Sequence, residues 1–511
     1  MGVHYAAGLM RAADGPWECR EALVHGDRRW TYGQLARTVR GVAAVLRSSP
    51  GARDGVAVLA DNRPEVVAVQ LATHLLGYQL ALLAPGATNA EREELLRHSR
   101  AGALVFAPGH AAAARALAAT AGIGELLSLG PAPSCRDLAA EAAARPAEPG
   151  PLPAAPVERV RTLLCTGGTT GLPKAVVHTH GLYDALTVLV GRHGLAVPGE
   201  RRLVCTPMSH ISGHFALPTL LSGGTVVLHD GFDPGAVLET VAVERVNALV
   251  LTSPLMYQLL DHPALPVTDH SSLRCLGYGA APTPLRRQQQ ALARLGPVLQ
   301  HIYGLTEAGV VTLLQPGEHH ADRPHSLAGA GRPVPGVRVE VRDEGGQRLP
   351  AGRAGEVWVR GPGVMAGYLG HPATTAEVIR DGWLRTGDIG SLDASGTLFL
   401  KARKNEVIMH ASGMRIYPRV VEEVLLSHPS VRTAAVFGVP DGGDGERVHA
   451  TVTPHPDAPV DPAALRAHVR AELGLDHMVP ESVDVVARLP VTRNGKVDRQ
   501  ALKDRAASDG R

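Results

Sequence analysis

The stretch LLCTGGTTGLPKAVVHTH, residues 163–180, decides how the rest of the chain is interpreted. Its apolar start, Leu163–Cys165, predicts the end of a buried strand, and the β-branched pair Val176–Val177 predicts a return to extended structure. Between them, three glycines let backbone N–H groups turn toward one point, while three threonines and Lys174 add donors and a positive charge. Gly and Thr are also common in ordinary surface turns, but their density here favours a polyphosphate-binding loop. It is not a Walker loop, because Lys174 is followed by Ala175.

The composition narrows the class of protein. At 511 residues the chain is too long for one hydrophobic core, so two or more domains are expected. A net charge of +2 gives no reason to expect nucleic acid or an anionic membrane as a partner. Five scattered cysteines predict a reduced cytoplasmic protein, and no secretory signal is expected at the start. The most hydrophobic window, 66–85, is interrupted by polar residues and predicts a core helix and strand, not a membrane span.

Alternating strand-like and helical patterns run to about residue 310 and predict a layered α/β architecture. A helix is expected after Thr31, a plausible N-cap, and strands are expected at 56–59, 81–83, 103–106, 226–228 and 248–251. Residues 110–160 are rich in alanine and then in proline, and they predict a helix followed by a loose connector.

The pattern changes after about residue 330. Short strands at 337–341 and 356–359 predict a small β-rich unit, and helices at 420–426 and 462–473 with strands at 433–436 and 483–486 predict a compact tail. The predicted fold is therefore α/β, with a large layered N-terminal domain of several subdomains and a small α+β C-terminal lid domain joined by a hinge. We place these domains at residues 1–402 and 403–511.

Seven motifs occur along the chain: TGGTTGLPKA (166–175), PMSHISG (207–213), GYGAAP (277–282), YGLTE (303–307), TGD (386–388), the region of Arg403, and PVTRNGKVDR (490–499). In this order they resemble the adenylate-forming (AMP-binding) superfamily, which includes acyl- and aryl-CoA synthetases, peptide-synthetase adenylation domains and luciferases. The resemblance implies an enzyme that joins a carboxylate to the α-phosphate of ATP and then passes the acyl group to a thiol. Because two anions meet in the first step, neutralisation of charge is the main requirement.

The resemblance assigns roles to residues of this chain. The β- and γ-phosphates would be held by the loop residues Thr166, Gly167, Gly168, Thr169, Thr170, Gly171 and Lys174, and Mg²⁺ by Thr170 and Glu307. The nucleotide would lie against Gly279, Ala280, Ala281, Pro282, Tyr303, Thr306, Asp388 and Arg403, with Asp388 accepting hydrogen bonds from both ribose hydroxyls. Lys496 would contact the reacting carboxylate when the lid closes, and Gly413 would line the path of the pantetheine of coenzyme A.

Each of these signals is weaker by itself. Asp388 taken alone has about even odds of being a plain turn residue, and a lysine in Asn-Gly-Lys is more often a solvated hairpin residue than a catalytic one. The ordered set of motifs favours function for both Asp388 and Lys496. His178, His180 and His301 are expected to be structural.

Three departures from the family pattern concern the first half-reaction. Gly167 and Ala175 replace a usual serine and glycine, and the stretch from Arg403 to Gly413 is one residue longer than usual. One hypothesis is that adenylation is weakened while thioester formation survives. The slightly favoured alternative is that the loop absorbs the extra residue without effect.

The predicted acid pocket indicates a hydrophobic substrate. His210 stands where amino-acid-activating relatives place an aspartate, which argues against an α-amino acid. The expected lining is His210, His214, Tyr278, Gly304 and Val310, which suits an aryl, fatty or polycyclic acid. The thiol is expected to be coenzyme A. The alternatives are a carrier-protein thiol, an enzyme that uses only a preformed acyl-adenylate, and a non-catalytic adenylate binder, against which Lys174, Glu307, Asp388 and Lys496 argue.

Overall fold

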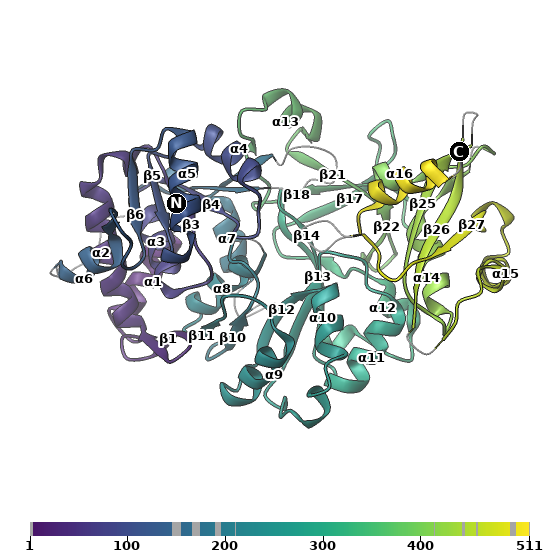
Figure 1. Cartoon of the computed structure of the whole chain (residues 1–511), viewed down its shortest axis with the longest axis horizontal. Helices are drawn as coiled ribbons and strands as arrows, with labels where there is room; N and C mark the ends of the chain where they lie inside the picture. The colour runs from purple at the N-terminus through teal and green to yellow at the C-terminus, as the bar shows by residue number, and fades with distance from the viewer. Residues whose placement is uncertain are drawn as a thin grey trace.

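The computed structural model describes residues 4–145, 155–165, 174–189, 196–209, 211–412, 414–441, 445–455, 458–490 and 497–509. Figure 1 shows a broad layered part that contains the N-terminus and a smaller unit, in green to yellow, that contains the C-terminus. The predicted α/β fold with a large N-terminal part and a small α+β C-terminal unit is confirmed. The predicted division at residues 402 and 403 falls at the end of β22 (Leu398–Arg403) and stays a prediction.

Two large sheets form the layered part. The eight-stranded sheet has the order β19 (Gly367–Tyr368), β9 (Ala175–Thr179), β8 (Arg161–Cys165), β4 (Gln79–Leu83), β3 (Val56–Leu59), β5 (Ala103–Phe106), β6 (Glu125–Ser128) and β7 (Arg136–Asp137). The nine-stranded sheet has the order β16 (Arg332–Pro333), β15 (Gly309–Leu314), β14 (Leu299–Leu305), β13 (Cys275–Gly279), β12 (Ala248–Thr252), β10 (Arg201–Val204), β11 (Thr225–Leu228), β1 (Glu21–His25) and β2 (Arg28–Thr31). Most neighbouring strands are parallel, as the alternation of strands and helices predicted.

The two sheets share one hydrophobic core. It is filled by residues of α1 (Tyr5–Ala13), α2 (Tyr32–Ser48), α3 (Pro64–Leu75), α7 (His180–Val188) and α8 (Ile211–Leu221). Val58 of β3 faces this core, whereas Ala57 and Leu59 face the opposite layer of α4 (Asn89–Ser99) and α5 (Ala111–Ala121). Because both faces are covered, every residue of β3 is buried, which explains its uninterrupted apolar sequence.

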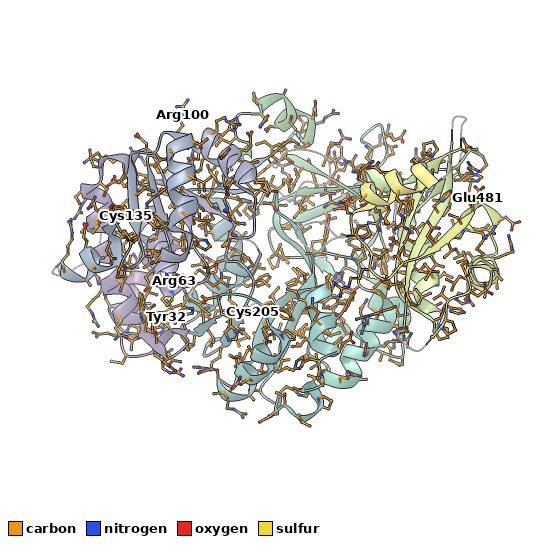
Figure 2. All side chains as sticks on the ribbon, viewed as in Figure 1. Tyr32, Arg63, Arg100, Cys135, Cys205 and Glu481 are labelled. Carbon is orange, nitrogen blue, oxygen red and sulfur yellow. The ribbon has the colours of Figure 1, made fainter. Side chains whose placement is uncertain are left out.

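Polar contacts fix the helices within these layers. Thr31 caps α2 through a reciprocal pair of hydrogen bonds with Gln34, as its position in the sequence predicted. The hydroxyl of Tyr32, which Figure 2 labels, lies 2.8 Å from the carbonyl oxygen of Leu220 and 2.7 Å from that of Gly224, and its one proton is shared between them. A buried hydrogen bond of this kind contributes about 1 kcal/mol, and here it joins α2 to the end of α8.

The outer face of the nine-stranded sheet packs on α9 (Pro234–Val243), α10 (Ser253–Leu260) and α11 (Leu285–Leu295). A third sheet follows in the chain, made of β17 (Arg338–Arg342), β18 (Gly355–Arg360), β21 (Trp383–Leu392), β20 (Ile379–Arg380) and β22. It contains the two short strands predicted after residue 330, and the short helix α13 (Pro372–Val378) lies in the connection from β18 to β20. The short helix α12 (Pro324–Ala328) lies between β15 and β16 of the nine-stranded sheet.

The C-terminal unit begins after the 3-10 turn η6 (Lys404–Glu406). It comprises the hairpin β23 (Ile408–Met409) and β24 (Arg415–Ile416), the sheet β25 (Val431–Pro440), β26 (Glu446–Pro454) and β27 (Ser482–Val485), and the helices α14 (Pro418–Ser427), α15 (Pro462–Leu473) and α16 (Arg499–Asp509). Its contacts with the layered part include an ion pair between Arg432 and Asp261 at 3.9 Å. The helix predicted at 462–473 matches α15 residue for residue.

The prediction for residues 110–160 is wrong in part. The expected helix is α5, but the stretch after it also forms β6, β7 and α6 (Leu138–Ala144). Ser128 and Asp137 are register partners in β6 and β7, at the edge of the eight-stranded sheet. Alanine-rich composition concealed these elements, since short edge strands need few β-branched residues when a neighbouring strand supplies the hydrogen bonds.

Among the residues that the structure describes, no helix is long and apolar enough to cross a membrane. The window at 66–85 forms α3 and β4 of the core, as predicted.

Candidate active site

The described residues of the predicted site come from the eight-stranded sheet, the nine-stranded sheet and the third sheet, or from turns that adjoin them. Strands β8 and β9 are antiparallel, and Cys165 pairs with Ala175, so the chain leaves and re-enters the eight-stranded sheet at neighbouring positions. The predicted phosphate-loop residues between them (Thr166, Gly167, Gly168, Thr169, Thr170 and Gly171) lie outside the described residues. Lys174 is described, and it marks the point where this loop rejoins the sheet.

Lys174 and Glu307 meet at the ring of Tyr368. The Tyr368 hydroxyl donates to Glu307 Oε1 at 2.8 Å, and Lys174 Nζ lies 5.6 Å from the centre of the same ring. Glu307 itself lies in the three-residue turn between β14 and β15, where its carbonyl accepts the Met365 N–H at 2.8 Å. Burial, together with the Glu307 carboxylate, raises the pKa of Tyr368, so this phenol remains a neutral donor. The Lys174 ammonium therefore lies over the ring of Tyr368, and the Glu307 carboxylate lies at the hydroxyl of the same residue.

Sequence reasoning missed Tyr368. It lies between glycines in GPGVMAGYLG, residues 361–370, where no apolar periodicity points to a site. The short strand β19 aligns it with Val176 of β9, two residues after Lys174. Only this long-range pairing brings the ring to the phosphate loop, and no local sequence signal reports it.

Asp388 is the centre of a second cluster. Its Oδ2 accepts the Tyr303 hydroxyl at 2.7 Å, and its Oδ1 lies 3.1 Å from Arg403 Nε. Arg403 also donates to the Thr386 carbonyl at 3.0 Å, and the Thr386 hydroxyl accepts the Asp388 N–H at 3.0 Å. Burial and the neighbouring carboxylate hold the pKa of Tyr303 well above its usual value. A carboxylate is an acceptor-only group with about four acceptor positions, and both oxygens of Asp388 are held in place by these neighbours.

The interpretation of Thr386–Asp388 as a plain turn is wrong. These residues lie inside the ten-residue strand β21, where Asp388 is the register partner of Arg403 on β22. Gly387 has φ +71°, a conformation that favours glycine, and the register shifts at Ile389 and Gly390. A bulged strand, not a turn, therefore aims Asp388 at Tyr303.

The two clusters lie close enough to share one electrostatic environment. The positive charge of Arg403 acts on the pKa of both Tyr303 and Tyr368, opposing the rise that burial causes in each. His178 supports the first of these clusters, because its Nε2 donates to the carbonyl of Thr306 at 2.6 Å and so fixes the turn that carries Glu307. Burial lowers the pKa of His178 to about 4, which keeps the imidazole neutral. As expected from the sequence, His178 is structural.

The predicted adenine-binding segment follows β13. Ala280 adopts φ +61°, and the Ser253 hydroxyl is placed to donate to the carbonyls of Gly279 and Ala281, at 3.3 and 3.1 Å. Gly279 permits this arrangement, since a Cβ there would lie 2.2 Å from the Ile302 carbonyl oxygen of β14. The backbone of residues 279–282 is therefore held in a tight turn beside Tyr303.

Replacing Gly279 by alanine is expected to lower the free energy of unfolding by about 1–3 kcal/mol, because β13 and β14 must separate to admit the methyl group. Gly317 is the matched control: a Cβ added there would meet nothing within 4 Å, and its φ is not positive. Gly317→Ala should change stability by about 0.5 kcal/mol or less. Urea unfolding of both variants measures the difference, and equal midpoints would contradict the close approach at Gly279.

The predicted acid pocket is described only in part. His210 and the side chain of His214 lie outside the described residues. Gly304 of β14 is the register partner of Val310 of β15, and their place in the pocket stays a prediction. The prediction that Tyr278 lines the acid pocket is wrong. Its side chain is fully buried on the outer face of β13, where its hydroxyl donates to Gln288 of α11 at 2.9 Å. Alternation along the strand points Tyr278 away from the face of Gly277 and Gly279, so it does not line a pocket on that face.

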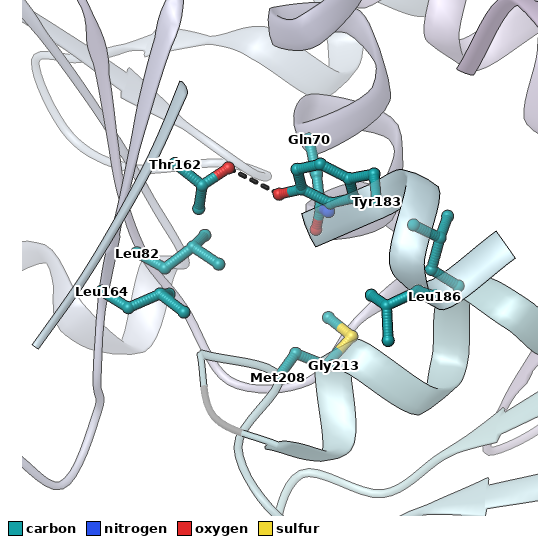
Figure 3. Close-up of a pocket in the computed structure, with 9 residues that line it drawn as sticks. Gln70, Leu82, Thr162, Leu164, Tyr183, Leu186, Met208 and Gly213 are labelled. Carbon is teal, nitrogen blue, oxygen red and sulfur yellow. Dashed lines mark hydrogen bonds between the residues drawn. The ribbon is translucent and has the colours of Figure 1, made fainter. Parts of the chain in front are cut away.

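A small cavity lies between the eight-stranded sheet and the helices α7 and α8 (Figure 3). Its volume of about 10 Å³ has room for about one water molecule. Leu164 of β8 and Met208 and Gly213 of the PMSHISG segment line it, and Thr162 and Tyr183 form a hydrogen bond at its rim. The cavity is therefore lined by the strand that leads into the phosphate loop in the sequence and by two residues of the PMSHISG segment.

The predicted lid residues Lys496 and Gly413 lie outside the described residues. Near them, Arg499 of α16 forms ion pairs with Glu422 at 2.6 Å and with Glu406 of η6 at 3.4 Å. Lys404 contacts Glu356 of the third sheet at 3.2 Å. Charged residues on both sides of the predicted hinge thus anchor it in this conformation.

Comparison with known proteins identifies the family. Residues 11–369 match the family described as AMP-binding enzyme, and residues 420–496 match its C-terminal domain. The chain belongs to the AMP-binding enzymes. The resemblance inferred from seven motifs is therefore confirmed, and so is the prediction of an enzyme of the acid–thiol ligase class.

Several members of the family cover nearly all of this chain. A feruloyl-CoA synthase of Amycolatopsis sp. is 37% identical over 96% of this chain and 98% of its own length. A medium/long-chain-fatty-acid–CoA ligase, FadD8 of Mycobacterium tuberculosis, is 35% identical over 95% of this chain and 87% of its own. Among solved structures, the amide bond synthetase McbA of Marinactinospora thermotolerans has a TM-score of 0.89 and 38% identity, with 98% of this chain and 99% of that chain covered. The relatives share the fold and differ in the acid and acceptor that their names state.

Proposed function

We propose that this AMP-binding enzyme activates a hydrophobic carboxylic acid as an acyl-adenylate and transfers the acyl group to the thiol of coenzyme A. The observation that supports this most is the approach of Lys174, Glu307 and Asp388 at the meeting point of three sheets. This set offers a cation for phosphate, a hard oxygen donor for a metal ion and an acceptor for ribose hydroxyls. The five free thiols support a cytoplasmic location.

In the first step a carboxylate oxygen attacks the α-phosphorus of ATP and pyrophosphate leaves. Lys174 offsets the negative charge of the phosphates, and Asp388 with Tyr303 and Arg403 fixes the nucleoside, which lowers the entropy lost in reaching the transition state. Glu307 suits Mg²⁺ because carboxylate oxygens are its preferred ligands, and Thr170 would complete the set. The ion would supply further neutralisation of the phosphates. Lys496 is assigned to the reacting carboxylate.

In the second step the thiol of coenzyme A attacks the acyl carbon and AMP leaves. A carrier-protein thiol requires the same chemistry and differs only in what presents the pantetheine. An amine is the second candidate acceptor, favoured by the 38% identity to the amide bond synthetase over almost the whole of both chains. Attack by an amine on the same adenylate would release AMP and give an amide, so the two candidates differ only after adenylation.

The reaction products distinguish the thiol from the amine as the acyl acceptor. The purified chain, ATP and Mg²⁺ are incubated with ferulate, a medium-chain fatty acid and a polycyclic acid, each with coenzyme A, with a primary amine, or with both. Mass spectrometry is expected to show the acyl-CoA of at least one acid, in excess of amide when both acceptors are present. Amide without thioester would assign the amine as acceptor. Thioester from a preformed adenylate, without any from acid and ATP, would assign only the second half-reaction.

A further inference from the structure

We propose that Glu94, His98 and His371 form a binding site for one divalent transition-metal ion of the zinc class. Glu94 and His98 lie one turn apart on α4, and His371 immediately precedes α13, which Figure 1 shows beside α4. The three potential ligand atoms all lie within 4.8 Å of one another, and all three residues are partly buried. Among the described residues this is the one cluster of three such side chains close enough to share an ion.

The distances fit one tetrahedral centre. With metal–ligand bonds of about 2.1 Å, two ligands of a tetrahedral ion lie about 3.4 Å apart. Glu94 Oε1 and His98 Nδ1 already have this separation, at 3.4 Å. The imidazole rings of His98 and His371 have centroids 5.5 Å apart. A small rotation of the His371 side chain therefore brings its ligand atom to the spacing that one tetrahedral ion requires. Binding through His98 Nδ1 would replace its 3.1 Å contact with the Glu94 carbonyl, and binding through Nε2 would retain it.

The surrounding chain holds these ligands in place. Gly370 packs so closely on the His98 ring that a Cβ there would lie 2.5 Å from His98 Cδ2. The His371 N–H donates to the Tyr368 carbonyl at 3.1 Å, and its own carbonyl accepts the Thr375 hydroxyl at 2.9 Å. Arg97 pairs with the other oxygen of Glu94, Oε2, and so leaves Oε1 directed at His98. Such supporting contacts orient ligands and raise metal affinity.

The donor set selects the kind of ion. Two imidazoles and one carboxylate suit Zn²⁺, Co²⁺ or Ni²⁺, whereas Mg²⁺ prefers oxygen ligands alone. Three protein ligands leave one tetrahedral position for water. The bound ion would join α4, on the eight-stranded sheet, to the segment that carries Tyr368 three residues before His371. It would be distinct from the ion proposed at Glu307, and the inference does not depend on the proposed function.

Cobalt provides a direct test, because tetrahedral Co²⁺ has intense visible absorption. The full chain is stripped of metal with a chelator and titrated with Co²⁺. A Cys19→Ser background removes the exposed thiol, which could otherwise bind the ion. We expect saturation at one equivalent, displacement of Co²⁺ by Zn²⁺ and a melting temperature that rises with metal concentration. Either His98→Ala or His371→Ala should weaken Co²⁺ binding by at least about 100-fold.

His110→Ala is the matched control. His110 also pairs with a carboxylate, Asp61 at 2.9 Å, but no third ligand stands close to this pair among the described side chains, so the variant should bind Co²⁺ as the parent does. The inference is overturned if binding is absent up to millimolar Co²⁺, if it is equal in the parent and in the His98 and His371 variants, or if Mg²⁺ displaces Co²⁺ as readily as Zn²⁺ does.

Discussion

Replacing Glu307 by glutamine is expected to reduce acid-dependent adenylate formation by about 100- to 1,000-fold, while the protein remains folded. Glutamine keeps the shape and an oxygen that accepts the Tyr368 hydroxyl, and the backbone bond to Met365 is unaffected. The substitution removes only the charge that is assigned to Mg²⁺. The measurement is the rate of acid-dependent pyrophosphate exchange as a function of Mg²⁺ concentration, with circular dichroism as the test of folding.

Tyr368→Phe is the matched control for Glu307. It removes the 2.8 Å hydrogen bond but leaves the carboxylate charge, so we expect about a tenfold loss that higher Mg²⁺ partly restores. Exchange in Glu307→Gln that equals the parent at saturating Mg²⁺ would remove Glu307 from the metal site. The position of the carboxylate beside Lys174 would then need a structural explanation.

Replacing Asp388 by asparagine is expected to raise the KM for ATP by about 10- to 100-fold, because hydrogen bonds from the ribose to a charged acceptor contribute about 1.5–3 kcal/mol each. Stability should also fall by about 1–3 kcal/mol, since the Arg403 guanidinium loses its anionic partner and must face an amide. Steady-state kinetics with varied ATP and urea unfolding measure the two effects separately.

Glu356→Gln is the matched control for Asp388→Asn, because it should change the free energy of unfolding without changing the binding of ATP. Glu356 is a buried carboxylate of the same sheet, paired with Arg385 at 2.9 Å and Lys404 at 3.2 Å, and it is not assigned to the nucleotide. Its substitution should lower stability by a similar amount and leave the KM for ATP within about twofold. If Asp388→Asn changes only stability, or if both variants raise the KM equally, Asp388 does not bind the ribose.

The fold could be predicted well where pattern and packing agree. The strand at 56–59 is apolar throughout because both of its faces are buried, and the helix at 462–473 begins after a capping Asp461 and ends before Gly474. The order of the motifs along the chain then indicated the family. These signals are local, and a local pattern can be recognised in a single sequence.

Predictions failed where a conformation depends on distant partners. Asp388 taken alone could have been a plain turn residue, but pairing with β18 and β22 extends β21 through this segment on both sides. Tyr278 lies between two glycines, so no neighbouring side chain reveals which face of β13 it occupies. Tyr368 is brought to Glu307 by pairing between β19 and β9, which are far apart in the sequence. No pattern in the local sequence indicates any of these three arrangements.

Acid-dependent exchange of labelled pyrophosphate into ATP tests the central claim most directly, because it reports reversible formation of the acyl-adenylate without any acceptor. With Mg²⁺ and the panel of hydrophobic acids, we predict exchange that requires the acid and at least one acid that clearly exceeds the no-acid control. Exchange would also show that Gly167, Ala175 and the long hinge are tolerated. Binding of ATP without exchange for any acid of the panel would contradict the proposed adenylation.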